Sequence, residues 1–302
     1  MQLCSRMCGC GLLALMVGLG AAAASGQETV PYDPATAGPP AVMFTVREVP
    51  KLGMEAAHDK SEAAQAAVQA AAKSPDTYLA MSSITGSESR VVFFRGYDTM
   101  GEIESRYMAT MKIPGLAEKL EKMDTADKAM LTGVGTAIWR LRPDLSSPGK
   151  INIAEMKMAE LVQINTKPGH SGDFEAVAKR VVAAWTATDP DYHADIYEMA
   201  LGHTEGDVFL VILPMKSMAH LDKVHDEHDA FMKALGEDAV KSDREAARNA
   251  YLSTEGNLFI FSPQMSNLPE SWVKYDPAYW KPKPMMAPVK KADAAKKADA
   301  AK

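Results

Sequence analysis

Six of the seven histidines of this 302-residue chain lie in its second half, where their ring nitrogens could do chemistry. The six are His170, His193, His203, His220, His225 and His228. His225 and His228 are three residues apart in a segment, 217–235, that we predict to be a helix, so they would be neighbours on one face. Asp222 and Asp229 flank them, and imidazole with carboxylate at this spacing can bind a divalent metal. His225 and His228 are therefore a predicted metal site, with a solvated helix face as the alternative.

Two predicted strands, 159–165 and 194–201, carry side chains suited to binding an organic ligand. Gln163 and Asn165 share one side of the first strand, because side chains alternate across a strand, and Tyr197 and Met199 share one side of the second. If these sides face a space between sheets, they offer an apolar or aromatic molecule a pocket with a few polar groups. Buried amides need partners, so paired core amides or exposed edge positions are the alternative.

The elements that must position these side chains occur in the same order twice along the chain. The predicted strands are 43–49, 78–85, 91–94 and 137–143 in the first copy, and 159–165, 194–201, 209–212 and 258–263 in the second. Helices are predicted after the first and third strand of each copy, and the first helix of each runs into a Pro-Asp pair, which ends a helix for steric reasons. The order is β-α-β-β-α-β in both copies.

The first helix of the second copy has a clear periodicity. Phe174, Val177, Val181 and Trp185 recur at helical spacing and predict one apolar face. The corresponding helix of the first copy, near 55–73, is rich in alanine and has few large apolar side chains, so its packing is not predicted.

This order is that of the split βαβ, or ferredoxin-like, arrangement. Each copy would form a four-stranded antiparallel sheet with both helices on one face, and the two bare faces would bury each other. We therefore predict an α+β fold in which two ferredoxin-like repeats, residues 43–145 and 156–266, pack their sheets as an α+β barrel. The sequence leaves open whether the repeats pair within one chain or across a dimer, with self-association through the sheet faces.

In its element order and repeat, the sequence resembles the dimeric α+β barrel superfamily, in a version with both halves in one chain. That superfamily includes cofactor-free monooxygenases, haem-degrading monooxygenases, chlorite dismutase-like haem proteins and small binding proteins. The resemblance implies a pocket between the sheets. For a haem-binding member it implies an iron ligand at His220 or His225, and for the haem-degrading type a role for Asn165.

The two ends of the chain lie outside the predicted fold. Residues 1–26 are typical of a secretory signal peptide, with Arg6 before a short apolar core and small residues after it. Residues 27–42 are expected to be a flexible segment and 267–302 a Pro/Lys/Ala-rich disordered tail. We expect export to the periplasm or beyond, with no transmembrane segment in the mature chain; an uncleaved anchor or a lipoprotein are the alternatives.

Composition excludes several classes of function. All three cysteines lie in the first 26 residues, so the mature chain has no thiol for disulfides, zinc or nucleophilic catalysis. The net charge of −6 argues against nucleic acid as a partner, because phosphate binding needs clustered cations. Phosphate-binding glycine loops and Gly-x-Ser-x-Gly elbows are absent from the sequence.

Three functional hypotheses remain. The first is an exported α+β barrel protein that binds a small apolar or aromatic ligand between its sheets, with Gln163, Asn165, Tyr197, Met199 and His220 as candidate contacts. The second is a small-molecule oxidoreductase, cofactor-free or haem-binding, that uses the second repeat. The third is a structural protein of the cell envelope. We expect no cofactor, with haem or a divalent metal as alternatives, and whether the chain is an enzyme is left open.

Overall fold

The computed structural model describes residues 38–202 and 205–281. The predicted signal peptide at 1–26, most of the predicted flexible segment at 27–42, His203 and residues 282–302 lie outside the described residues. Within the described ranges, no helix combines the length and the apolar composition that crossing a membrane requires.

Each half of the chain has four strands with helices after its first and third strand. The first half contains β1 (Val42–Pro50), α2 (Glu55–Ala71), β2 (Leu79–Ser83), β3 (Val91–Tyr97), α3 (Met100–Met111), α4 (Leu116–Lys128) and β4 (Leu131–Leu141). The second contains β5 (Met158–Thr166), α5 (Ser171–Thr188), β6 (Asp195–Leu201), β7 (Val208–Met215), α6 (Ala219–Asp226), α7 (His228–Leu235), α8 (Glu237–Ala250) and β8 (Tyr251–Phe261). The helix predicted over 217–235 is therefore two helices, broken at Glu227.

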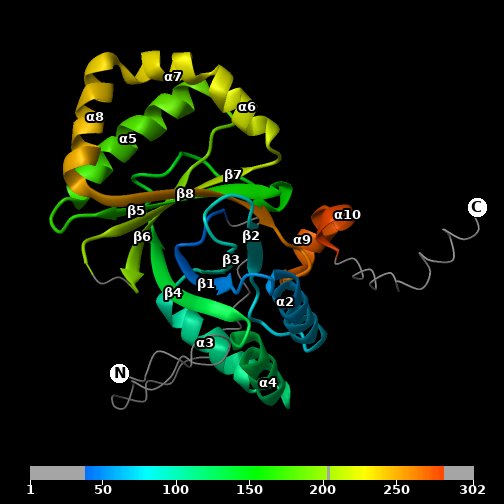
Figure 1. Ribbon diagram of the computed structural model, residues 1–302. Coiled ribbons are helices and arrows are strands. Elements are labelled where there is room, and N and C mark those ends of the chain that lie inside the picture. Colours follow the sequence, from blue (N-terminus) through cyan, green and yellow to red (C-terminus); the bar gives the residue numbers. More distant parts are fainter. Residues whose placement is uncertain (1–37, 203–204, 282–302) are drawn as a thin grey trace, which may run out of the picture.

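The eight strands close into one barrel in the order β1-β3-β2-β8-β5-β7-β6-β4, with antiparallel neighbours (Figure 1). Two seams join the halves: β2 pairs with β8, where Met81 faces Phe261, and β4 pairs with β6, where Trp139 faces Met199. The predicted α+β barrel is confirmed, and its halves pair within one chain. Closure encloses the inner sheet faces, so these faces are not available for self-association.

Alternation along each strand separates a barrel interior from an outer face covered by helices. On β1, Met43 points into the main apolar cluster inside the barrel, whereas Val42 and Phe44 point outward into a second cluster. Figure 1 shows α2, α3 and α4 on one side of the barrel and α5 to α8 on the opposite side. The interior is therefore lined by every second residue of all eight strands.

The buried face of α5 differs from the predicted one. Phe174, Ala178 and Val182 face the sheet, with Phe174 stacked on Phe209 of β7 at a centroid distance of 4.1 Å. Trp185 instead stacks on Phe231 of α7 at 4.3 Å. The helix packs against both the sheet and the α7–α8 layer, so its apolar residues divide between two faces.

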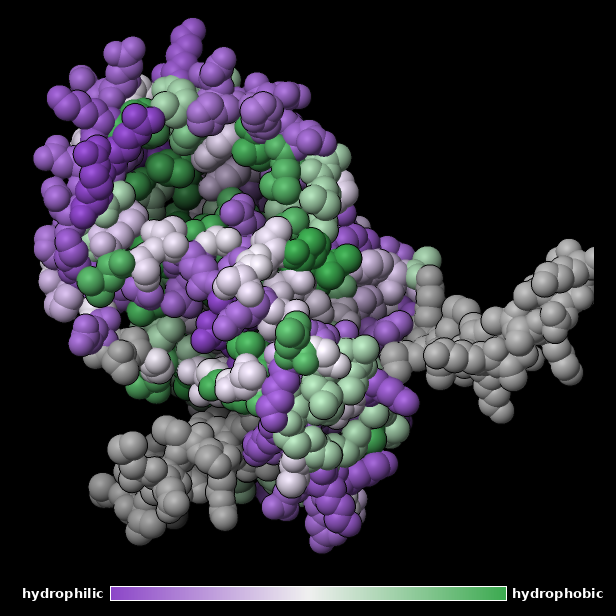
Figure 2. Space-filling view, viewed as in Figure 1, coloured by the Kyte–Doolittle hydropathy of each residue, from purple (hydrophilic) through white to green (hydrophobic). Residues whose placement is uncertain are grey.

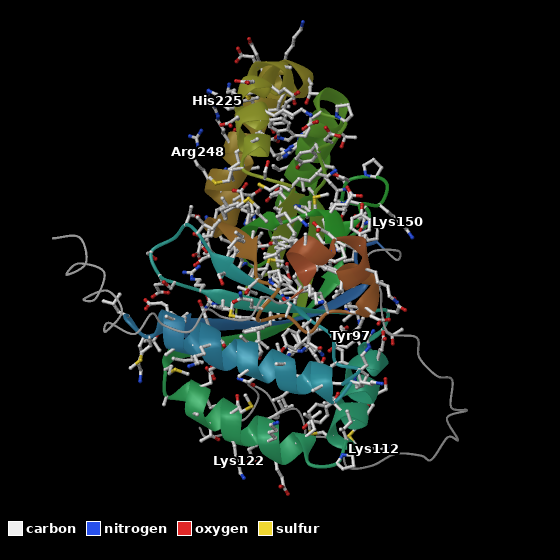
Figure 3. The ribbon with its side chains drawn as sticks, turned by 90° about the vertical axis from the view of Figure 1, so that its right-hand side faces the viewer. Tyr97, Lys112, Lys122, Lys150, His225 and Arg248 are labelled. Atoms are coloured by element: carbon white, nitrogen blue, oxygen red, sulfur yellow. The ribbon has the colours of Figure 1, made fainter. Side chains whose placement is uncertain are left out.

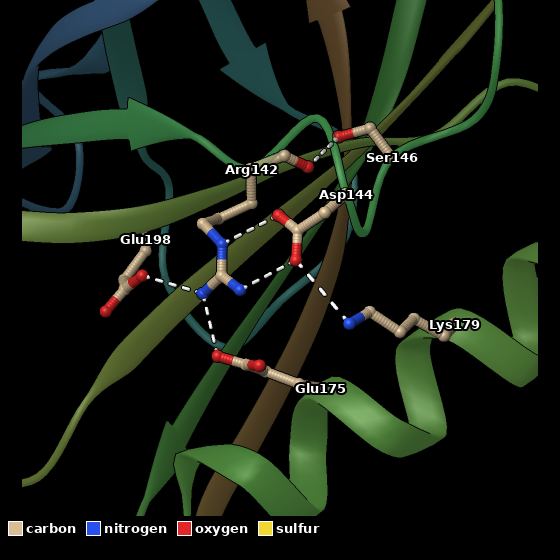
Figure 4. Close-up of polar contacts among 6 residues, drawn as sticks. All are labelled: Arg142, Asp144, Ser146, Glu175, Lys179 and Glu198. Atoms are coloured by element: carbon tan, nitrogen blue, oxygen red, sulfur yellow. Dashed lines mark hydrogen bonds and ion pairs between the residues drawn. The ribbon is translucent and has the colours of Figure 1, made fainter.

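Arg142 fastens the first half to the second just after β4 ends. Its guanidinium donates hydrogen bonds to Glu198 of β6 at 2.9 Å and to Glu175 of α5 at 2.8 Å, and it also binds Asp144 (Figure 4). Hydrogen bonds to Asp144 and then Glu175 raise the pKa of Arg142 above its usual range. The connection between the halves thus begins at a fixed ion-pair network.

Residues 267–281, the start of the predicted disordered tail, are ordered. They form α9 (Glu270–Tyr275) and α10 (Pro277–Trp280), and we call this segment the C-terminal cap. Trp272 and Trp280 are buried in the main interior cluster, and the indole Nε1 of Trp280 donates to the carbonyl oxygen of Ala154 at 2.7 Å. The predicted boundary at 267 is wrong because these two aromatic side chains gain enough burial to order the segment.

Candidate functional site

A cavity of about 240 Å³ lies inside the barrel at the end away from the C-terminal cap; we call it the barrel cavity. Inward-pointing side chains of seven strands and the loop before β3 surround it. Its deeper part is apolar and aromatic, with Phe94, Trp139, Leu161, Leu210 and Phe259, and its rim is polar, with Arg47, Arg90, Gln163, Glu255 and Asn257. The cavity exceeds the roughly 150 Å³ that accommodates a benzene molecule and is smaller than most drug sites.

Trp139 is held in the cavity wall by a hydrogen bond to the adjacent strand β1. Its indole Nε1 donates to Thr45 Oγ1 at 2.9 Å, and both residues are buried. A buried indole N–H needs a partner, so Thr45 fixes the orientation of the largest aromatic surface in the cavity.

Replacing Thr45 with valine should destabilise the fold by about 1–3 kcal/mol, because the shape is kept while the Trp139 N–H loses its acceptor. Urea unfolding measures this difference. The matched variant Thr132→Val changes an exposed threonine on the same pair of strands and should change the unfolding free energy by less than about 0.5 kcal/mol. Equal effects from the two variants would contradict the role assigned to Thr45.

The rim of the barrel cavity contains two separate sets of polar side chains, each joined by hydrogen bonds. Arg90 pairs with Glu255, which also accepts a hydrogen bond from Asn257 at 3.0 Å. Burial works to raise the pKa of Glu255, but the hydrogen bond and the charge of Arg90 outweigh it, and the pKa lies below its usual range. On β5, Gln163 donates to Asn165 at 3.1 Å, and Asn165 donates to Ser253 at 2.7 Å.

Arg47 is the cationic group of the rim that remains available to a ligand. It is exposed, and its guanidinium makes no hydrogen bond or ion pair with the part of the chain that the structure describes, although its charge helps to lower the pKa of Glu255. Gly135 lies opposite it on β4, where an added Cβ would meet only the Arg47 side chain at 3.8 Å. This part of the rim is therefore open and positively charged.

A second, smaller cavity of about 110 Å³ lies toward the C-terminal cap. Met43, Tyr78, Leu79, Tyr197 and Trp272 contribute to its mainly apolar wall. The Tyr197 hydroxyl donates to the carbonyl oxygen of Pro40 at 3.1 Å, which fixes the segment before β1 against the barrel.

The structure brings only some of the predicted site residues together. Gln163 and Met199 line the barrel cavity, and Asn165 lies beside it through its hydrogen bond to Gln163. Tyr197 points inward from the same strand as Met199 but lines the smaller cavity instead.

The predicted histidine candidates lie outside the barrel. His220 and His225 are on α6, and His228 begins α7. The helix is interrupted at Glu227, so the two residues of the predicted metal pair lie on different helices. His225 and His228 are exposed, and Figure 3 shows His225 on the outer surface of the helical layer. Among the described residues, they do not share a group of three metal-ligating side chains.

No described histidine lines the barrel cavity or the smaller cavity, so His220 and His225, the haem ligands that the resemblance implied, do not face either one. The two buried histidines, His58 and His193, each hydrogen-bond a carboxylate, at 2.8 Å and 3.0 Å. His220 is half-buried on α6, outside the barrel.

A separate hollow lies outside the barrel, beneath the arch of α6, α7 and α8. Figure 2 shows this face hollowed there, with hydrophobic side chains inside the hollow. The outer face of the sheet below the arch carries Val162, Val211 and Leu213, which are half-buried, and Ile260, which is exposed. We call this the outer hollow; a ligand there would be distinguishable from one in the barrel cavity.

The most informative residue of the barrel cavity, Arg47, was not predicted from the sequence. The alternation of side chains along the strand 43–49 could have indicated it, because Arg47 shares a side with Met43 and Thr45, both of which point inward. A charged residue on the buried side of a strand marks either the end of the core or a binding group.

Comparisons with known proteins support the fold. No protein-family model and no curated protein matches the sequence. The structure is similar to that of an anthrone oxidase-like protein, with a TM-score of 0.51, 12% identity, and coverage of 73% of this chain and 91% of the other. It also matches chlorite dismutase from Candidatus Nitrospira defluvii in complex with imidazole, with a TM-score of 0.41, 11% identity, and coverage of 78% and 95%. At 12% identity, the likeness to the anthrone oxidase-like protein shows a shared α+β barrel fold alone.

Proposed function

We propose that this chain binds a small aromatic carboxylate in the barrel cavity. The observation that supports this most directly is Arg47, a guanidinium without a protein hydrogen-bond partner in the described chain, at the rim of a cavity with an aromatic interior. Guanidinium groups bind carboxylates through paired, charge-assisted hydrogen bonds. Trp139, Phe94 and Phe259 offer apolar surface to a ring held by that carboxylate.

The charge balance of the rim supports an anionic ligand. Arg90 is already paired with Glu255, so Arg47 adds a positive charge that no rim carboxylate neutralises by direct contact. A ligand carboxylate bound by Arg47 would form a second ion pair at the opening, beside the pair of Arg90 and Glu255. The amides of Gln163 and Asn257 supply further donors near the same place.

Binding without chemistry fits the cavity better than acid–base catalysis does. Glu255 is the carboxylate among the lining residues, and its lowered pKa makes it a poor proton acceptor. We therefore favour binding over the oxidoreductase and envelope-structure hypotheses.

Export of the mature chain is also part of the proposal. Mass spectrometry of the N-terminus of the protein from its native host tests it, because an exported chain should be cleaved near residue 26.

The binding proposal is tested with 2-naphthoate and its neutral analogue 2-naphthamide, using calorimetry or intrinsic fluorescence. A ligand of this size is expected to bind with a Kd on the order of 10⁻⁴ M. Arg47→Gln should weaken 2-naphthoate binding by about tenfold to a hundredfold, the value of a charge-assisted hydrogen bond, and should leave 2-naphthamide binding unchanged.

Arg140→Gln is the matched control, because Arg140 is an exposed arginine on the neighbouring strand β4 that points away from the cavity. It should not change binding of either compound. Equal losses in Arg47→Gln and Arg140→Gln would indicate a general charge effect, and no binding of either compound to the wild-type chain would overturn the proposal.

A further inference from the structure

Four metal-ligating side chains meet outside the barrel, between β1, α2 and α4 of the first half. They are Glu48, His58, Glu62 and Asp127, which we call the acid–histidine cluster. One ligand atom of each lies within 4.8 Å of the others, and all four residues are buried. None of them lines the barrel cavity, and none was singled out by the sequence.

The cluster contains more carboxylates than one imidazole can neutralise. Glu48, Glu62 and Asp127 are three carboxyl groups buried around a single imidazole. A buried group of this composition must either retain protons or gain positive charge from elsewhere. A divalent cation would supply that charge.

Two buried atoms of the cluster, Asp127 Oδ1 and His58 Nδ1, lack hydrogen-bond partners among the described residues. The other oxygen of Asp127, Oδ2, lies 3.6 Å from His58 Nε2. The side chain of Asp127 is only 3% exposed. One oxygen of this buried carboxylate thus has no hydrogen-bond partner, which is unusual unless something else binds it.

The imidazole of His58 presents Nε2 to the cluster. His58 Nε2 lies 2.8 Å from Glu48 Oε2, while Nδ1 has no hydrogen-bond partner among the described residues and lies 3.7 Å from the carboxylate of Asp59. A metal at Nε2 would leave the Nδ1 hydrogen on the side of Asp59, where a small side-chain movement would let that carboxylate accept it and orient the imidazole. Gln65 donates to Glu62 at 2.7 Å and positions that carboxyl group.

The packing of α2 gives such a metal a structural role. Its buried residues are His58, Glu62, Gln65, Ala66 and Gln69, of which only the alanine is apolar. Burial of this face contributes little hydrophobic stabilisation, so α2 needs another attachment to the sheet and to α4. The cluster contains one residue from β1 and one from α4, the two elements that α2 must be held against.

We propose that the acid–histidine cluster binds a divalent transition-metal cation that fastens α2 and α4 to β1. Three carboxylates and one imidazole favour Mn²⁺ or Zn²⁺ over Mg²⁺ and Ca²⁺, which prefer oxygen ligands alone. The ligand atoms need to close in by only about an ångström to reach metal–ligand distances near 2.1 Å.

The test uses the full chain and Mn²⁺, which binds thiols weakly and so avoids Cys4, Cys8 and Cys10. Loss of the free Mn²⁺ electron paramagnetic resonance signal should report one site per chain, and saturation should raise the Tm by about 5 °C or more. Asp127→Asn, which keeps the shape of the side chain, should weaken binding by about a hundredfold or more. His58→Gln should do the same.

Asp124→Asn is the matched control, one turn earlier on α4, where Asp124 pairs with Lys128 at 2.6 Å. It should bind Mn²⁺ as the wild type does, and circular dichroism should show that every variant is folded. Undiminished binding in a folded Asp127→Asn variant would overturn the proposal, as would the absence of a site in the wild type. Binding lost in His225→Ala/His228→Ala, but kept in Asp127→Asn, would place the metal on α6 and α7 and equally overturn it.

Discussion

Replacing Gly135 with phenylalanine should reduce the affinity for 2-naphthoate by about a hundredfold or more without unfolding the protein. Gly135 lies on β4, and its backbone dihedral angles are ones that residues with side chains also adopt. An added Cβ would meet only the Arg47 side chain, at 3.8 Å and 3.9 Å. The phenyl ring would then occupy the space between Arg47 and the aromatic interior. Calorimetric titration measures the affinity.

Gly133→Phe is the control for this experiment. Gly133 lies two residues earlier on the same strand, and an added Cβ there meets no atom within 4 Å. The ring would project beyond the cavity, so the affinity should stay within about twofold of the wild type. If Gly135→Phe folds and binds 2-naphthoate normally, the ligand does not enter the barrel cavity.

Replacing Trp280 with alanine should cost about 3–5 kcal/mol of unfolding free energy, the usual loss for a large buried aromatic residue. Trp280 is fully buried, its ring centroid lies 4.8 Å from that of Trp272, and its N–H donates to Ala154. Its removal would leave a void and an unpaired carbonyl oxygen under the C-terminal cap. Urea unfolding monitored by far-ultraviolet circular dichroism gives the value.

Tyr275→Ala provides the comparison, because Tyr275 belongs to the same cap but is half exposed. Its urea midpoint should stay close to that of the wild type. A loss below about 1 kcal/mol for Trp280→Ala would mean that the C-terminal cap is not part of the folded core.

The strands of the barrel were predictable because their residues obey a two-residue period and a strong preference for extended structure. The run at 91–94 and its counterpart at 209–212 became β3 and β7, and α2 and α5 end before Pro75 and Pro190 as predicted. The closed barrel followed from the need of two one-sided sheets to bury their open faces. The seams that close it depend on pairings between distant strands, which no local pattern encodes.

The apolar face of α5 was mispredicted because large side chains were weighted over small ones. Ala178 and Ala184 are buried where the helix approaches its neighbours closely, whereas Val177 and Val181 are only half-buried. The partner of Trp185 is Phe231, in a helix more than 40 residues later. A helix between two layers has two buried faces, and periodicity alone does not separate them.

The candidate sites were also hard to predict, because sequence patterns do not show which distant residues meet in the fold. Six histidines lie close together in sequence, yet the structure spreads the five that it describes over α6, α7 and the segments just before and after α5. The acid–histidine cluster has the opposite character: its members span about 80 residues and three elements, and only His58 and Glu62 are visible as a helical pair. Density of a residue type along the chain is therefore a poor guide to a site that tertiary packing assembles.

The most direct test of our proposal that the barrel cavity binds an aromatic carboxylate is a crystal structure of the protein soaked with 2-naphthoate. We expect electron density for the ring between Trp139, Phe94 and Phe259, with the carboxylate toward Arg47. Density for the ligand in the outer hollow beneath α6, α7 and α8, or none in the barrel at saturating concentration, would contradict it.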